Sequence, residues 1–225
     1  GHRVRRLGLK EPGQPVTTIA GVEPGYRDAP GAMARFRSPW GMAYDGAGAL
    51  IVADTYNPCI RRIDLADPAH PVTTIAGGQR GYADGTGRAA AFESPAAVAV
   101  DVASRPMKIY VADGANSCIR LLEPGPGGAK VTTLGGAPVP APEDAWWVDV
   151  PLMYPAGITA GPAGDLWVAD QTANVLYRVT PAGRLTVMAG DAGAPPGRRD
   201  GPTFWARLRT RASSSWMRGM RRRPS

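Results

Sequence analysis

The sequence predicts an all-β protein built from repeated four-stranded antiparallel units. Segments of the VTTIAG type recur at intervals of 54 to 59 residues, beginning at Val16, Val72, Val131 and Leu185. A V-A-D triplet recurs with the same period, ending at Asp54, Asp113 and Asp170. Between these markers, short apolar-alternating runs are separated by Gly, Pro, Asn and Asp clusters, which is the pattern of strands and turns. A period of this length is typical of solenoids, propellers and arrays.

Each unit contains four strand-like runs and no amphipathic stretch of helix length. In residues 39–77 the runs are GMAY, ALIVAD, CIRRID and PVTTIAG. Four strands per repeat predict the blade of a β-propeller. We therefore expect full blades over residues 39–77, 95–136 and 155–190.

The ends of the chain continue the pattern incompletely. Residues 4–21 align without a gap to residues 60–77, so they are expected to supply only the third and fourth strands of a half blade. Residues 191–206 start a further blade. The prediction is a partial propeller or open arc of about three and a half blades over residues 1–206, and hence a fragment of a longer propeller.

The segments P-x-G-x-A-x-D, G-x-L-x-V-A-D, N-x-x-I-R and V-T-T-x-A-G resemble NHL repeats. The variant is the one with a long connection, seen as GYADGTGRAAAFESP from Gly81 and GYRDAPGAMARFRSP from Gly25. The resemblance covers about residues 1–206. It implies a propeller, typically of about six blades, that serves mostly as a binding platform. A minority of relatives are lyases or hydrolases.

Polar residues recur at one end of the predicted blades. In a four-stranded antiparallel blade, the turn between the second and third strands emerges beside the connection to the next blade. That end carries the repeated residues Asp54, Asn57, Asp113, Asn116 and Asp170. They form either a ligand or cation platform or a set of structural turns in which side chains satisfy backbone amides. The structural reading is favoured because an active site is normally made by residues that break a repeat.

Three arginines on the predicted third strands, Arg61, Arg120 and Arg178, are expected to tie blades together through carboxylates. Better candidates for ligand contact flank the long connections, namely Tyr26, Arg27, Arg80, Tyr82 and Asp84. The connection to the third full unit departs from the pattern and contains Trp146 and Trp147 beside acidic residues. This pair is either a ligand-binding patch or, as favoured here, a cap on the core between blades.

The net charge of +7 is concentrated at one end of the sequence. Residues 1–197 contain 17 basic and 18 acidic residues, whereas the remainder is strongly basic. Residues 207–225 lack every repeat motif, and they are either a genuine basic tail or the product of a shifted reading frame. A shifted reading frame is favoured. In that frame the codons of Trp216 and Met217 encode an x-Asp dipeptide, which is the pattern required at the end of the first strand of a blade. Nucleic acid or anionic lipid is an expected partner only if the tail is genuine.

The remaining residues favour binding over catalysis. Cys59 and Cys118 occupy one position in consecutive blades about 10 Å apart, beyond disulfide reach. No catalytic residue, metal set or cofactor is predicted, and no run of 18 apolar residues would span a membrane. The sequence indicates no cellular compartment. The predicted function is a scaffold that binds a protein or other macromolecule through its loop face. The alternative is part of a propeller-type lyase or hydrolase whose metal site lies in other blades.

Overall fold

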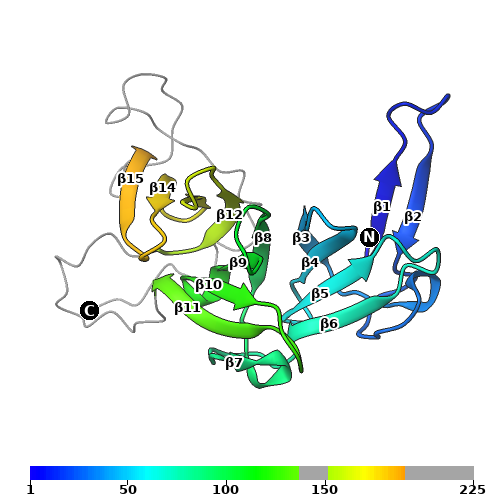
Figure 1. The fold of residues 1–225 in the computed structure, drawn as a ribbon, viewed down its shortest axis with the longest axis horizontal. Coiled ribbons are helices and arrows are strands. Elements are labelled where there is room, and N and C mark those ends of the chain that lie inside the picture. The colour runs from blue at the N-terminus through cyan, green and yellow to red at the C-terminus, as the bar shows by residue number, and fades with distance from the viewer. Residues whose placement is uncertain (137–151, 191–225) are drawn as a thin grey trace, which may run out of the picture.

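The computed structural model of the protein describes residues 1–136 and 152–190. It confirms an all-β fold of antiparallel four-stranded sheets (Figure 1). Trp146, Trp147, the predicted start of a further blade at 191–206 and the basic segment at 207–225 lie outside the described residues. In the described part of the chain, no helix is long and apolar enough to cross a membrane.

The sheets follow one another along the chain. A two-stranded sheet comes first, formed by β1 (Val4–Leu7) and β2 (Val16–Ala20). The second sheet contains β3 (Pro39–Tyr44), β4 (Ala49–Asp54), β5 (Cys59–Asp64) and β6 (Val72–Gly77). The third sheet contains β8 (Pro95–Asp101), β9 (Lys108–Asp113), β10 (Cys118–Glu123) and β11 (Lys130–Gly136), extended at its outer edge by β7 (Gly85–Thr86).

The fourth sheet contains β12 (Pro155–Ala160), β13 (Leu166–Asp170), β14 (Val175–Val179) and β15 (Leu185–Gly190). Among the described residues, single-turn 3₁₀ helices lie between strands at Gly31–Met33, Gly87–Ala89 and Gly114–Asn116. Neighbouring strands in each four-stranded sheet are consecutive in the sequence, so each sheet is a meander.

The strand register repeats from sheet to sheet. Asp54 faces Cys59 at the turn between β4 and β5, and Asp113 faces Cys118 at the corresponding turn of the next sheet. The β1–β2 pair has the register of β5–β6, including a bulge after its first residue pair. The first two strands therefore occupy the places of the third and fourth strands in the other sheets.

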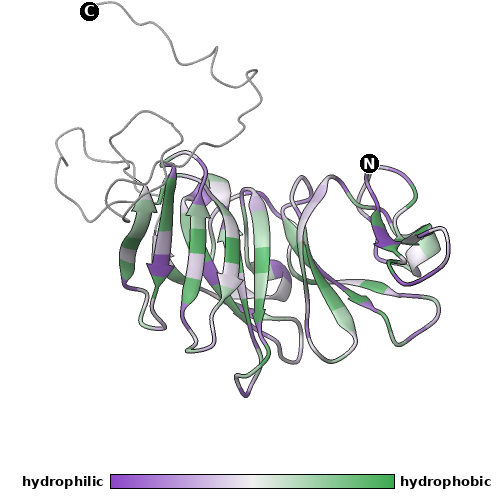
Figure 2. Ribbon diagram, turned by 90° about the horizontal axis from the view of Figure 1, so that it is seen from above, coloured by the Kyte–Doolittle hydropathy of each residue, from purple (hydrophilic) through white to green (hydrophobic). Residues whose placement is uncertain are grey.

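Apolar side chains fill the space between successive sheets, and Figure 2 shows hydrophobic residues along the strands of these sheets. One core lies between the second and third sheets and another between the third and fourth. The inner strands β3, β8 and β12 lie side by side. Gly41 on β3 permits this close approach, because a Cβ atom there would lie 2.5 Å from Cα of Ala97 on β8. Small residues thus set the spacing of the inner strands.

Cys59 and Cys118 are fully buried free thiols in consecutive sheets. Burial raises the pKa of the Cys118 thiol to about 12 and raises the pKa of Cys59 above its ordinary range. We expect neither thiol to react with Ellman's reagent at pH 8 unless the protein is unfolded. The unfolded thiols ionise near pH 9 while the folded ones keep their protons, so stability should hold below pH 9 and fall above it. Thiol titration and urea unfolding at several pH values test both statements.

Candidate functional site

The loop face is formed by two long connections, residues 22–38 and 78–94, together with the turns at 54–58 and 113–117. The turns and connections contact each other directly. The Asn57 amide donates a hydrogen bond of 2.7 Å to the carbonyl of Gly25, and Asn116 donates one of 2.8 Å to the carbonyl of Gly81. Each turn therefore holds the connection that precedes its own sheet.

Asp54 lies at the end of β4 with no exposed surface. Its Oδ1 accepts the backbone N–H of Arg37 at 2.7 Å, and its Oδ2 accepts the Asn57 amide at 2.8 Å. Both groups belong to the loop face, so this carboxylate joins a turn to a connection. Its carboxylate oxygens are thus occupied by the Arg37 backbone N–H and the Asn57 side-chain amide, and they hold both groups in place.

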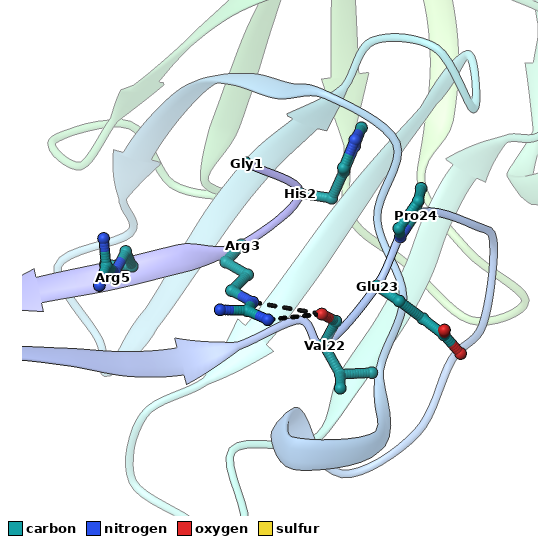
Figure 3. Close-up of a pocket in the computed structure, with 7 residues that line it drawn as sticks. All are labelled: Gly1, His2, Arg3, Arg5, Val22, Glu23 and Pro24. Atoms are coloured by element: carbon teal, nitrogen blue, oxygen red, sulfur yellow. Dashed lines mark hydrogen bonds between the residues drawn. The ribbon is translucent and has the colours of Figure 1, made fainter.

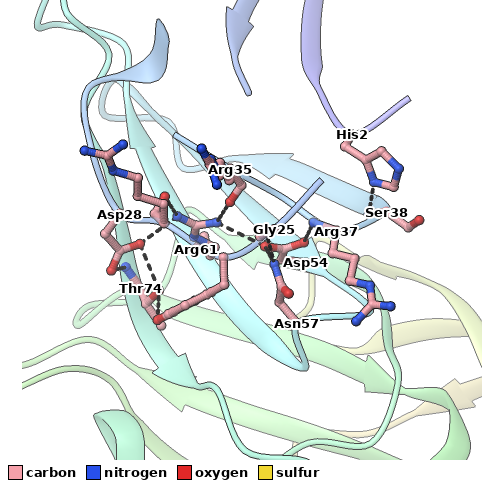
Figure 4. Close-up of polar contacts among 12 residues, drawn as sticks. His2, Gly25, Asp28, Arg35, Arg37, Ser38, Asp54, Asn57, Arg61 and Thr74 are labelled. Atoms are coloured by element: carbon pink, nitrogen blue, oxygen red, sulfur yellow. Dashed lines mark hydrogen bonds and ion pairs between the residues drawn. The ribbon is translucent and has the colours of Figure 1, made fainter. Parts of the chain in front are cut away.

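Arg61 is the centre of this arrangement, shown in Figure 4. Its guanidinium is fully buried and forms ion pairs with Asp54 at 3.0 Å and with Asp28 at 2.7 Å. It also donates hydrogen bonds of 2.6 Å to the carbonyls of Arg27 and Arg35. One side chain on β5 thus fixes both limbs of the connection 22–38. We call this set of contacts the arginine clamp.

Aromatic rings complete the clamp. The Arg61 guanidinium lies 4.5 Å from the ring centroid of Phe36 and 5.3 Å from that of Tyr26. Such cation–π contacts are stronger away from water. Tyr26 also joins its hydroxyl to Thr74 Oγ1 at 2.8 Å, while Asp28 accepts the Thr74 backbone N–H at 3.0 Å. The connection is thereby bound to the outer strand β6 as well.

The next repeat builds a second clamp from corresponding residues. Arg120 pairs with Asp84 at 2.8 Å and with Asp113 at 3.3 Å, and it donates to the carbonyls of Ala83 and Ala91. Tyr82 reaches Thr133 Oγ1 at 3.0 Å. The candidate contact residues Tyr26, Tyr82 and Asp84 are therefore engaged within the fold, although the two tyrosines remain 40% and 42% exposed.

Burial dominates the electrostatics of the clamp carboxylates. The pKa values of Asp54 and Asp113 are raised above the ordinary range, first because of burial. Hydrogen bonds and the neighbouring arginines lower these pKa values but do not offset the loss of water. The arginines are therefore needed to balance the negative charge of the buried carboxylates, which have lost their hydration.

The fourth sheet differs at the position of the clamp. Asp170 accepts the backbone N–H groups of Met153 and Tyr154, as the clamp aspartates accept those of their connections. Arg178, however, donates to Asp165 at 2.7 Å, the residue that precedes β13 in its own sheet. The sequence predicts that all three arginines tie blades together through carboxylates, and Arg178 instead pairs within its own sheet. Arg61 and Arg120 pair with carboxylates of their own sheet and of the connection that precedes it, so they bind a connection to its sheet and not one blade to the next.

The strand register explains the difference. Arg61 faces Val52 and Arg120 faces Val111, but Arg178 faces Trp167, one step further along the strand. Tyr177 faces Val168 and occupies the clamp position. Asn174 lies four residues after Asp170, whereas Asn57 and Asn116 lie three residues after their aspartates. Its side chain donates to the Thr172 carbonyl and not to a connection. A one-residue shift moves a side chain to the opposite face of a sheet.

Arg27 and Arg80 are exposed on the connections. Arg27 takes part in the clamp through its backbone carbonyl, while the Arg80 side chain pairs with Glu93. Tyr56, which is not among the residues that the sequence predicts for ligand contact, is 49% exposed in the turn beside Asn57. Its backbone N–H bonds the carbonyl of Arg37 at 3.0 Å. The sequence signal at this position is an aromatic residue in a D-x-x-N turn, where the next repeat has Ala115.

The two connections also touch each other. Arg88, from the second connection, lies 5.6 Å from the ring centroid of Tyr26 and 3.8 Å from Asp28 Oδ2. The loop face is therefore a continuous surface across two repeats. In the part of the chain that the structure describes, no group of three His, Cys, Asp or Glu side chains has the arrangement of a metal site.

The family model for the NHL repeat matches residues 36–63. The chloroplastic protein SUPPRESSOR OF QUENCHING 1 of Arabidopsis thaliana is 30% identical over 130 residues, which is 53% of this chain and 12% of that protein. This chain therefore spans about an eighth of that relative.

Among solved structures, the nidogen/laminin complex has a chain that is 18% identical, with a TM-score of 0.57 over 84% of this chain and 58% of that one. Virginiamycin B lyase from Staphylococcus aureus is 16% identical, with a TM-score of 0.50 over 83% of this chain and 48% of the lyase. This chain spans about half the length of these structures. At such identities the similarity shows a shared β-propeller fold alone.

Proposed function

Because this chain is built from NHL repeats folded as blades of a β-propeller, we propose that it is a binding scaffold that recognises a protein through its loop face. The observation that carries the proposal is the presence of exposed tyrosines over a fixed framework. Tyr26, Tyr56 and Tyr82 are between 40% and 49% exposed. Tyrosine and arginine are the side chains most enriched in protein interfaces.

The clamps support this function by holding the surface in place. Both connections are fixed by a buried arginine, a buried aspartate and an asparagine. A preorganised surface loses less conformational entropy when it binds a partner. The exposed arginines Arg27, Arg37, Arg80 and Arg88 lie on the same two connections as Tyr26 and Tyr82, and they would pair with acidic groups of the partner.

The charge distribution favours a protein over a polyanion. Residues 1–197 have nearly balanced charge, and the excess of arginine lies beyond them. Binding to nucleic acid or anionic lipid depends chiefly on positive charge and weakens steeply with salt. A partner of the loop face should instead remain bound at about 0.3 M salt, because aromatic contacts are not screened.

The alternative of a lyase or hydrolase rests on fold similarity alone. The repeated carboxylates of the loop face are engaged with the clamp arginines and with backbone N–H groups. A reaction site would have to use other residues or other blades. A bound stoichiometric metal whose removal abolishes turnover would establish the enzyme.

The test compares charge reversal on opposite sides of the protein. The loop-face variant is Arg27→Glu with Arg80→Glu, and the matched control is Arg105→Glu with Arg184→Glu, in turns at the other end of the strands. Each immobilised protein is exposed to nuclease-treated extract at 0.3 M salt, and retained proteins are identified by mass spectrometry. We expect the wild type and the control to retain the same protein and the loop-face variant to lose it. Equal retention by all three would contradict the proposal.

A further inference from the structure

Arg88 holds a second cation against the outer side of the first clamp. Its guanidinium lies 5.6 Å from the ring centroid of Tyr26 and 3.8 Å from Asp28 Oδ2. The Tyr26 ring thus contacts two guanidinium groups, that of the buried Arg61 and that of Arg88, whose side chain is 67% exposed. An aromatic ring beside a carboxylate attracts a cation through both groups. The surface of the first clamp therefore contains an occupied cation site.

The second repeat presents the same pair of groups. Tyr82 and Asp84 correspond in the sequence to Tyr26 and Asp28. The Thr133 hydroxyl lies 3.0 Å from the Tyr82 hydroxyl and 3.0 Å from Asp84 Oδ1. The equivalent threonine on β6 makes the same two hydrogen bonds in the first repeat. The ring and the carboxylate are therefore placed alike in the two repeats.

The backbones that carry the two tyrosines also match. In each connection, the glycine before the tyrosine donates a backbone hydrogen bond of 3.0 Å to the carbonyl of a phenylalanine, Phe36 or Phe92. The first connection is also held at its start, where Arg3 donates hydrogen bonds of 3.2 and 2.9 Å to the carbonyl of Val22, as Figure 3 shows. Each ring therefore projects from a backbone of the same fixed shape.

In the described part of the chain, the second repeat lacks the outer cation. Arg120 lies 5.0 Å from the ring centroid of Tyr82, on its buried side, and no other described guanidinium lies over this ring. Among the described residues, Asp84 forms an ion pair with Arg120 alone. The Asp84 side chain is 50% exposed, whereas that of Asp28, beside Arg88, is 31% exposed. The exposed side of this carboxylate is therefore available to a cation.

The two clamps differ in charge as a result. In the first, two carboxylates face two guanidinium groups, of which Arg88 is the second. In the second, Asp84 and Asp113 face Arg120 alone among the described residues. The second clamp thus has one more negative than positive charge, and the excess lies at the half-exposed carboxylate of Asp84.

The connection that follows the third sheet cannot supply the missing cation. Arg88 belongs to the connection that follows the second sheet, and residues 137–154 have the same place after the third. Those residues contain no lysine or arginine, but they contain Glu143, Asp144 and Asp149. A cation that reaches Tyr82 must therefore come from outside this connection.

We propose that Tyr82 and Asp84 form a docking site for an arginine side chain of a partner polypeptide. The partner's guanidinium lies on the exposed face of the Tyr82 ring and pairs with Asp84, as Arg88 does at the first clamp. Arginine is favoured over lysine because its planar guanidinium stacks on aromatic rings and is more weakly hydrated. This inference rests on the proposed function of the loop face, and it specifies one group that the bound protein must present.

The probe is acetyl-arginine amide, added at constant ionic strength to the full 225-residue chain and followed by nuclear magnetic resonance. The backbone N–H of Thr133, which donates to Asp84 at 3.2 Å, reports on the proposed site. The backbone N–H of Thr74, which donates to Asp28 at 3.0 Å, reports on the occupied site. We expect the Thr133 resonance to shift saturably and the Thr74 resonance to stay unchanged. Acetyl-citrulline amide, which has the same shape without the charge, should shift neither.

Tyr82→Leu should weaken binding of the probe at least about threefold, the ratio that corresponds to an exposed cation–π contact. Asp84→Asn should weaken it by about the same factor, since an exposed ion pair is of comparable strength. The matched control is Tyr44→Leu, because Tyr44 is 54% exposed at the end of β3 that lies away from the connections. This control should bind the probe as the wild type does, and circular dichroism verifies the fold of each variant.

Arg88→Ala tests the site without altering Tyr82 or Asp84. It removes the cation from Tyr26 and Asp28 and should therefore create a second site, so that the Thr74 resonance shifts as well. The dissociation constants at the two sites should agree within about threefold, because the groups that bind the probe are the same. This gain of a site keeps the proposal testable even if a substitution at Tyr82 or Asp84 weakens the fold.

Three results would overturn the proposal. The first is the absence of a saturable Thr133 shift with the arginine probe. The second is an equal shift with the citrulline probe or in the Tyr82→Leu variant. The third is a Thr133 resonance that moves, without any probe, when every arginine of residues 207–225 is replaced by glutamine, because arginines of this chain would then fill the site.

The extract experiment separates this inference from the scaffold. If the wild type and Tyr82→Leu retain the same protein equally and the titration fails, the scaffold stands and the arginine site is refuted. If the probe binds at Tyr82 but the loop face retains no protein, the scaffold is refuted and the arginine site stands.

Discussion

Replacing Arg61 by alanine is expected to lower the free energy of unfolding by about 3–5 kcal/mol. The change removes both ion pairs of the clamp and leaves the Asp54 carboxylate buried without a cation. It also removes the hydrogen bonds that hold the carbonyls of Arg27 and Arg35. Urea unfolding followed by circular dichroism measures the loss.

The matched control for this change is Arg62→Ala. Arg62 is the next residue on β5, is partly exposed and forms a single ion pair with Asp64. Exposed pairs of this kind contribute about 0–1 kcal/mol. Similar losses for the two variants would show that Arg61 contributes only as a surface cation and would refute the clamp.

Replacing Gly41 by alanine should lower the free energy of unfolding by about 3 kcal/mol, although alanine is generally favoured over glycine in a strand. The new Cβ atom would lie 2.5 Å from Cα of Ala97 and 2.6 Å from the carbonyl oxygen of Ala96. Both are backbone atoms that cannot turn aside, so β3 and β8 must separate. Thermal and urea unfolding of the variant test this expectation.

Gly157→Ala provides the matched control, because Gly157 has the same place in the P-x-G segment of β12. Its added Cβ would lie 3.4 Å from the nearest described atom, Cβ of Ala169, which is ordinary van der Waals contact. This variant should retain or slightly increase stability. A comparable loss in both proteins would mean that strand conformation, and not inter-sheet contact, requires the glycine.

The repeated pattern was sufficient to predict the fold class. Alternating apolar residues and turn clusters indicated four strands per unit, and the structure confirms four-stranded antiparallel sheets. The placement of the D-x-x-N turns beside the long connections also followed from strand connectivity alone. These features are local or follow from the order of the strands, and so they can be inferred from one sequence.

The side-chain partners could not be predicted in the same way. Arg178 has the same distance from its asparagine as Arg61 and Arg120 have from theirs, so sequence alignment placed all three together. The hairpin register is set from the turn, and it brings Tyr177 to the clamp position instead. Tyr177 is buried among apolar residues, and burial raises the pKa of its hydroxyl to about 12.

Exposure depends on distant strands and is therefore hard to infer locally. Trp40, Met42 and Tyr44 belong to an ordinary first strand, and their exposure becomes evident only when the neighbouring sheet is seen to stop short of them. The sequence predicts Tyr26 and Tyr82 as contact residues, and in the structure their hydroxyls form hydrogen bonds within the fold. The role of Tyr26, Tyr56 and Tyr82 in partner binding remains a prediction.

The position of the clamp partners along the chain affects which segment can be duplicated as a complete repeat. The hydrogen bonds and ion pairs of Arg61 all lie within residues 22–77, and those of Arg120 all lie within residues 78–136. The self-contained module is thus a connection followed by its sheet. A duplication that begins just after a fourth strand copies an arginine together with all its acceptors, whereas one that begins at a first strand separates them. Duplication of a connection together with its sheet therefore adds a blade in which the buried arginine and aspartate charges still balance each other.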